Sequence, residues 1–242
     1  MDEPHFFEFH VADGVGWIDL ARPEQGNTLT RERMVALAAL IRDCAGREDV
    51  SVIALTARGD AFCRGRDGRG ESRDGMSAWQ IREQHMGAVL GVYEAISAAP
   101  LPVIACVQGA AFGFGAALAG ACDITLASSA ARFALPEIEH GIPATMAMAA
   151  LLRKVPHKAL TYLIYSADEI DAAAAGRLGL ASVVYEADAF ETLSRAFILK
   201  LAARPRLTLE TIKRYLVKAP DLSAAMASDY AGHLLALVRS GR

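Results

Sequence analysis

The chain has 242 residues, of which 53% are hydrophobic and 22% charged, and its 25 basic and 28 acidic side chains give a formal net charge of −3. This apolar content excludes an intrinsically disordered protein, which could not bury enough surface to offset its chain entropy. The balanced charge argues against a nucleic-acid-binding surface, because neutralising phosphates requires clustered positive charge.

The N-terminal part of the chain predicts a hairpin, a helix and a buried strand, in that order. Alternating apolar residues on both sides of an Asp-Gly turn indicate a β-hairpin over residues 7–20. Thr30 can cap a helix that Gly46 ends, and the β-branched residues 50–56 are typical of a buried strand. The glycine- and arginine-rich residues 58–75 are expected to form a loop.

The middle of the chain alternates between helices and strands. The spacing of apolar residues predicts a helix over 77–97, a strand over 103–107, a helix over 113–121 and a strand over 124–127. The apolar residues 101–122 are long enough to span a membrane, but a proline, four glycines and flanks without aromatic or basic anchors favour a buried strand and helix. We therefore expect an α/β fold with a mainly parallel sheet and no membrane association.

The C-terminal part is predominantly helical. Helices are expected over three ranges ahead of the last strand, residues 144–154, 157–165 and 171–178. The last strand is expected over 181–184, and three further helical stretches reach the C-terminus. The pattern predicts a core over residues 1–186 and an appended helical module over residues 187–242.

The cysteines and the N-terminus indicate a reducing compartment. No two cysteines form a C-x-x-C pair, and neither cysteines nor histidines show the spacing of a metal site, so we expect buried reduced thiols and no metal. No basic region precedes an apolar stretch at the N-terminus, so no secretory signal is predicted. The expected location is the cytoplasm.

Two glycine-containing turns follow buried strands. Residues 109–115 open a helix whose first N–H groups carry partial positive charge, and its glycines let a ligand approach them closely. The turn could hold an oxyanion, or its glycines could serve only helix–strand packing. It does not match a dinucleotide fingerprint, because Leu118 stands at the place of the third glycine. An earlier turn in the chain, residues 61–67, could supply the other N–H donor.

These segments resemble motifs of the crotonase (enoyl-CoA hydratase/isomerase) superfamily. The turn Ala61-Phe62-Cys63-Arg64-Gly65-Arg66-Asp67 resembles the family's F-C-A-G-A-D turn. Four other stretches resemble its remaining motifs in the right order, namely residues 22–29, 102–124, 133–142 and 168–184. The resemblance covers nearly the whole chain and implies a crotonase-like ββα spiral core.

The resemblance also implies a specific chemistry. Family members hold a CoA thioester with its carbonyl oxygen between two backbone N–H groups, which stabilise an enolate. By position, these donors are the N–H groups of Arg66 and Phe114. Glu137 matches a glutamate that acts as general acid and base in the family's P-E loop. The second glutamate of family hydratases falls on Ala117, which cannot transfer a proton.

Family isomerases use the P-E glutamate alone and move a proton from C2 of a 3-enoyl thioester to C4. The sequence therefore favours Δ3,Δ2-enoyl-CoA isomerisation by Glu137, whose apolar neighbours would raise its pKa if the loop is partly dry rather than solvated. Two alternatives stay open. One is an enoyl-CoA hydratase that uses Glu94 or an ordered water as the second group, and the other is a CoA-binding protein without catalysis.

Further positions follow from the same resemblance. It places eight residues against the substrate: Leu29, Arg64, Gly65, Asp67, Gly113, Ala117, Pro136 and Thr145. Arg64 and Arg66 stand where this turn usually has small residues, and they could capture the CoA phosphates or be neutralised by neighbouring acids. The resemblance implies no cofactor beyond the CoA of the acyl-CoA substrate. It also implies a homotrimer or hexamer in which residues 187–242 serve oligomerisation.

Overall fold

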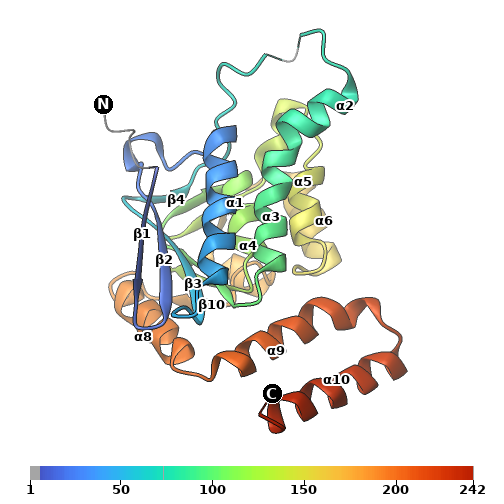
Figure 1. The fold of residues 1–242 in the computed structure, drawn as a ribbon. Coiled ribbons are helices and arrows are strands. Elements are labelled where there is room, and N and C mark those ends of the chain that lie inside the picture. The colour runs from blue at the N-terminus through green and yellow to red at the C-terminus, as the bar shows by residue number, and fades with distance from the viewer. Residues whose placement is uncertain (1–5, 73, 242) are drawn as a thin grey trace.

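The computed structural model describes residues 6–72 and 74–241, which contain two sheets (Figure 1). The larger sheet consists, in spatial order, of β1 (Phe7–Ala12), β2 (Val15–Leu20), β3 (Val52–Ala57), β5 (Val103–Val107), β7 (Ile124–Ser128) and β10 (Val183–Tyr185). The smaller sheet consists of β4 (Ala61–Cys63), β6 (Ala110–Phe112), β8 (Arg132–Ala134) and β9 (Ile170–Asp171). The β1–β2 and β8–β9 pairs are antiparallel and the other pairs are parallel. The expected α/β fold with a mainly parallel sheet is confirmed.

The predicted hairpin forms around a tight turn between β1 and β2. Ala12 pairs with Val15, and the two residues between them, Asp13 and Gly14, have φ angles of 54° and 75°. Two successive positive φ angles match the turn type that fits the right-handed twist of a two-residue hairpin. The Asp-Gly pair therefore fixes the register of the first two strands.

A repeated pattern links the two sheets. Each of β3, β5 and β7 is followed by a short strand of the smaller sheet, respectively β4, β6 and β8. The sequence predicts a loop where β4 lies and a turn where β6 lies, and both predictions are wrong at those positions. Three-residue strands carry no readable periodicity and form because parallel neighbours pair with them, as Ala61 does with Ala110.

Helices follow these strand pairs. Their bounds are α2 (Ala78–Ile81), α3 (Gly87–Ala98), α4 (Phe114–Ala121), α5 (Thr145–Leu151), α6 (His157–Ser166) and α7 (Ala172–Arg177). Short helical turns also lie along the chain, namely η1 (Pro23–Gln25), η3 (Pro136–His140) and η4 (Ala219–Asp221). The helix predicted over 77–97 is confirmed, and it contains a π-helical segment, η2 (Arg82–Met86), between α2 and α3. Ser77 and Gln80 form a capping box at the start of α2.

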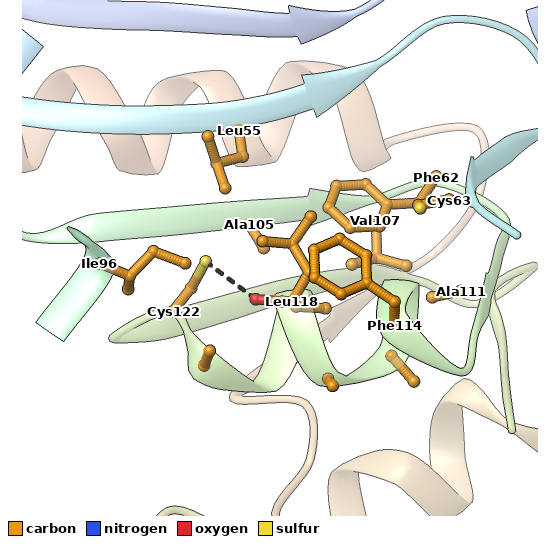
Figure 2. Packing of buried hydrophobic residues seen from close by; sticks show 14 of the residues in the cluster. Leu55, Phe62, Cys63, Ile96, Ala105, Val107, Ala111, Phe114, Leu118 and Cys122 are labelled. Atoms are coloured by element: carbon orange, nitrogen blue, oxygen red, sulfur yellow. Dashed lines mark hydrogen bonds between the residues drawn. The ribbon is translucent and has the colours of Figure 1, made fainter. Parts of the chain in front are cut away.

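The main core lies between the two sheets and the helices that pack on them. The helix α1 (Arg31–Gly46) is capped by Thr30 as expected and packs along α3. Figure 2 shows Leu118 and Phe114 of α4 among side chains that include Leu55 and Phe62. All of α4 is buried, which is why its sequence is apolar on every face.

The cysteines behave as the sequence predicted. All four are free and buried, and the Cys122 thiol donates to the Leu118 carbonyl at 3.3 Å (Figure 2). Burial raises the pKa of the Cys63 thiol to about 12, so this thiol stays protonated at neutral pH. The apolar residues 101–122 form β5, β6 and α4, and no helix of the described residues is long and apolar enough to cross a bilayer.

The last three helices divide between the core and an arm. α8 (Phe190–Ala202) packs on the outer face of the larger sheet, where Phe190 and Ile198 join a second apolar cluster. α9 (Arg206–Lys218) and α10 (Ala224–Arg239) pair with each other and extend beside the core as an arm (Figure 1). The division expected after residue 186 stays a prediction, and packing places α8 with the sheet rather than with the arm.

Lys213 joins this arm to the core. It is 4% exposed, and its Nζ donates to the carbonyls of Ile96 and Leu101 at 2.8 and 2.9 Å. Nζ also lies 2.7 Å from Asp123 Oδ2, which accepts the Val103 N–H. Burial lowers the pKa of Lys213, and the charge of Asp123 opposes this shift. One ammonium therefore fixes α9 against the end of α3 and the start of β5.

Replacing Lys213 by Met should destabilise the fold by about 3 kcal/mol, because it breaks a buried ion pair and leaves carbonyls without their donor. Chemical denaturation measures this loss. Lys218→Met, at an exposed position of the same helix, is the matched control and should change stability by less than about 0.5 kcal/mol. A loss of the same size in both variants would contradict the role given to Lys213.

Candidate active site

The first turn of the candidate site carries the backbone N–H of Arg66. Arg66 pairs with Leu29 in an isolated parallel bridge. The Leu29 N–H donates to the Gly65 carbonyl at 3.1 Å, and the Asp67 N–H donates to the Leu29 carbonyl at 2.9 Å. Arg66 lies between these two bonded residues, Gly65 and Asp67, and in a parallel bridge such a residue directs its own N–H away from the partner, here Leu29. The Arg66 N–H accordingly has no backbone or side-chain acceptor among the described residues.

The second turn carries the N–H of Phe114, the first residue of α4. Gly113 precedes it with φ 51° and ψ −117°, a conformation that residues with a Cβ avoid. The Gly113 N–H donates to the Ala134 carbonyl at 2.9 Å, and the Gly113 carbonyl accepts the Ala117 N–H at 3.0 Å. Among the described residues, the Phe114 N–H has no acceptor, as expected at a helix N-terminus.

The two turns can pack closely because Gly65 and Gly115 have no side chains at their contact. A methyl group at Gly115 would lie 1.9 Å from the Cys63 carbonyl oxygen, and one at Gly65 would lie 3.2 Å from that of Phe112. Gly115 therefore serves close packing, whereas Gly113 provides the backbone conformation that opens α4. The packing interpretation of this turn is confirmed for Gly115, and the oxyanion interpretation stays a prediction. The site brings together two unpaired N–H groups of the kind that stabilises an oxyanion.

Glu137 lies beside the second turn, on η3. A methyl group at Gly113 would lie 3.3 Å from Glu137 Oε1, and Glu137 Oε2 is buried without a hydrogen-bond partner among the described residues. Burial raises the pKa of this carboxyl. Its neighbours Leu135 and Pro136 lead into η3, whose later residues are exposed. The partly dry setting expected from the sequence is present, and it suits a group that takes up and releases a proton.

Tyr93 is a site residue that the sequence analysis did not identify. Its ring stacks on Phe114 with centroids 5.8 Å apart, and burial together with the nearby charge of Glu137 raises the pKa of its hydroxyl. The hydroxyl therefore stays protonated at neutral pH. The apolar spacing that predicts the helix over 77–97 places Tyr93 on the same face as Val89 and Ile96, and this spacing was the available signal.

The structure separates the other proton-transfer candidates from Glu137. Glu94 follows Tyr93 on α3 but is exposed, and it borders a surface hollow with Lys213 and Arg214 of α9. This position gives no support to Glu94 as a second acid. Ala117 is fully buried in α4, and Thr145 is exposed at the first residue of α5.

The arginines near the first turn are mostly neutralised by acids. Arg66 forms an ion pair with Glu71, and Arg69 forms a bidentate pair with Asp67 that lowers the pKa of this carboxyl to about 2. Arg64 is exposed beside the Phe112 ring and forms none of the ion pairs found among the described residues. Across residues 6–72 and 74–241, no group of three or more His, Cys, Asp or Glu side chains is arranged to hold a metal ion.

The sequence model of the enoyl-CoA hydratase/isomerase family matches residues 10–234. The chain belongs to this family. The (E)-benzylidenesuccinyl-CoA hydratase of Thauera aromatica is 29% identical over 233 residues, which cover 93% of this chain and 87% of that protein. The human mitochondrial enoyl-CoA hydratase domain-containing protein 3 is 31% identical over 228 residues, which cover 92% and 74%.

Solved structures agree with this assignment. An enoyl-CoA hydratase of Mycobacterium smegmatis superposes with a TM-score of 0.89 at 30% identity, covering 97% of this chain and 90% of that one. The crotonase-type fold expected from the sequence is confirmed, including the C-terminal helices. The protein is thus an acyl-CoA enzyme of the enoyl-CoA hydratase/isomerase family.

The setting of Glu137 predicts a pH-dependent cost to stability. Because the pKa of Glu137 is raised in the folded state, its contribution to stability is present below the ordinary glutamate pKa and is lost as pH rises through the raised value. Glu137→Gln stays neutral and should raise the melting temperature over wild type more at about pH 8 than at about pH 5. Differential scanning calorimetry at both pH values measures this difference.

The control is Glu139→Gln, at an exposed position two residues further along η3. It should leave the melting temperature unchanged at both pH values. A gain from Glu137→Gln that is equal at both pH values would contradict a raised pKa.

Proposed function

We propose that this enzyme converts a 3-enoyl-CoA into the conjugated 2-enoyl-CoA, with Glu137 carrying the proton. The observation that carries the proposal is the position of Glu137 Oε1 beside the Gly113 turn, while Ala117 stands where family hydratases have their second glutamate. One carboxylate beside two unpaired N–H groups is sufficient for a proton shift through an enolate.

The proposed reaction has two proton transfers. The Glu137 carboxylate removes a proton from C2, and the electron pair of that C–H bond forms a dienolate whose negative charge gathers on the thioester oxygen. The N–H groups of Arg66 and Phe114 donate to this oxygen and stabilise the charge. The protonated Glu137 then returns its proton to C4, and the double bond moves from C3–C4 to C2–C3.

The second candidate is hydration of a 2-enoyl-CoA. The names of relatives such as the (E)-benzylidenesuccinyl-CoA hydratase favour it. In this chain a hydratase would rely on Glu137 alone to activate water, because Ala117 cannot transfer a proton and Glu94 is directed to the surface. The raised pKa of Glu137 is compatible with either reaction, so the two candidates differ in substrate rather than in the base.

The same proposal extends to substrate contacts and assembly. Arg64 is the arginine of the first turn that is available to a CoA phosphate, since Arg66 and Arg69 are paired with acids. The residues proposed to contact the thioester lie around the first turn (Leu29, Gly65 and Asp67) and around the second (Gly113, Ala117 and Pro136). Thr145 lies exposed at the start of α5. The apolar residues that α9 and α10 leave exposed, such as Leu216 and Leu235, support self-association, for which the proposal is a homotrimer or hexamer.

Purified enzyme mixed with a trans-3-enoyl-CoA should produce the ultraviolet absorbance of a conjugated thioester. Glu137→Gln should lower the rate by at least about 100-fold, because the general base is lost while the side chain keeps its shape. The matched control Glu139→Gln should retain the wild-type rate. Loss of absorbance when a 2-enoyl-CoA is supplied instead would identify a hydratase, and no change with either substrate would leave a CoA-binding protein.

A second experiment separates backbone from side chain at the oxyanion site. Gly113→Ala should lower kcat by about 100-fold, because the new methyl strains the backbone that presents the Phe114 N–H and crowds Glu137. Phe114→Leu keeps that N–H and should lower kcat by less than about tenfold. Steady-state kinetics, with thermal melting to verify folding, measures both. Equal losses would contradict a backbone donor at this position.

A further inference from the structure

The side chain of Arg66 leads from the oxyanion site into a buried charge network. Its guanidinium pairs with Glu71 Oε2, and His85 Nδ1 lies 2.9 Å from the same oxygen. The three side chains are largely buried, with exposures of 17%, 14% and 8%. One carboxylate oxygen thus connects the turn that carries an N–H donor with the π-helical segment η2.

The charges in this network are defined by its contacts. Burial on its own acts to raise the pKa of Glu71, but the hydrogen bonds from His85 and Arg66 outweigh it and hold the pKa below its ordinary value. Glu71 is therefore ionised at neutral pH and only accepts hydrogen bonds. His85 must then carry a proton on Nδ1 to donate to it. This fixes the tautomer and the ring orientation of His85.

The backbone around the donor needs such support. The peptide between Gly65 and Arg66 follows a glycine with φ 112°, where no Cβ restricts rotation. The backbone holds this turn through the Leu29 bridge and one further hydrogen bond, from the Arg64 N–H to the Gly26 carbonyl at 2.9 Å, rather than through a continuous ladder. The chain from Arg64 to Met76 contains no helix or strand among its described residues. The ion pair of the Arg66 side chain adds a restraint that comes from outside these backbone bonds.

Stability alone does not account for the network. A buried ion pair contributes little net stability, because the loss of hydration offsets the attraction between the charges. η2 is a π-helical turn, a rare element that is frequent at functional sites, and His85 is its buried residue. The buried charges therefore point to a role in geometry.

We propose that Glu71 and His85 are positioning residues that hold the Arg66 N–H in the oxyanion site by fixing the Arg66 side chain; this rests on the proposed function. Through this network, the position of the Arg66 N–H depends on η2, which carries His85 and continues into α3. Its loss should lower kcat more than it raises KM, because the donor acts on the charge that develops in the transition state.

The test compares three variants of the full-length enzyme. His85→Leu removes the donor to Glu71 and should lower kcat about tenfold with KM changed by less than about twofold, since small displacements of a donor reduce rate strongly. His85→Asn places an amide N–H near the position of Nδ1 and should restore kcat to within about threefold of wild type. Arg82→Gln, at an exposed residue of the same segment, is the matched control and should behave as wild type.

A second readout does not depend on turnover. A cinnamoyl-CoA that carries a para-dimethylamino group absorbs at longer wavelength when its thioester oxygen accepts hydrogen bonds. Wild type, Arg82→Gln and His85→Asn should produce this shift on binding, and His85→Leu should reduce it. Thermal melting establishes folding, and Glu71→Gln provides an independent break of the network if His85→Leu does not fold.

The outcomes separate this inference from the proposed reaction. A wild-type shift without isomerisation would overturn the reaction alone, and the spectra of the variants would still decide the network. An unchanged kcat and shift in folded His85→Leu or Glu71→Gln would overturn the network alone. A wild-type enzyme that does not shift the absorption of the bound thioester would overturn both.

Discussion

The rest of the site depends on two backbone N–H groups that stay without acceptors at the ends of neighbouring short strands. β4 and β6 are parallel, so the turns after them leave the smaller sheet at the same edge. Leu29 bonds to the Gly65 carbonyl and the Asp67 N–H, so the Arg66 N–H between them has no acceptor among the described residues. The Phe114 N–H at the start of α4 likewise has none there. The absence of a side chain at Gly115 then lets the two turns touch. Unpaired donors cost stability, and in the proposed reaction they donate to the thioester oxygen of the substrate.

The partly buried carboxylate of Glu137 also destabilises the fold at this site. Its carboxylate is half-buried beside Gly113, with an oxygen that has no partner among the described residues. The same burial that destabilises the charged form raises the pKa and prepares the group to exchange protons. The large apolar core around α4 offsets these costs, and Lys213 fixes the arm of α9 and α10 against it. Stability is thus concentrated in the layers around the site rather than within it.

Much of this arrangement is readable from local sequence. The Asp-Gly hairpin, the Thr30 cap and the strands of the larger sheet follow from turn chemistry and apolar periodicity, and the motifs around Gly65, Gly113 and Glu137 indicate the family. The short strands β4 and β6 and the π-helical segment η2 are not readable in this way. They are set by pairing and packing between segments distant in the sequence.

The sequence by itself therefore determined the α/β class, the family and the identity of the candidate base, because these depend on residue type and spacing along the chain. Only the tertiary structure decided which acids and aromatics meet at the site. Tyr93 rather than its neighbour Glu94 packs on Phe114 at the site, since a helix turns successive residues to different sides. Glu71 and His85 meet Arg66 because an irregular loop returns to the π-helical segment, and no local pattern encodes such a return.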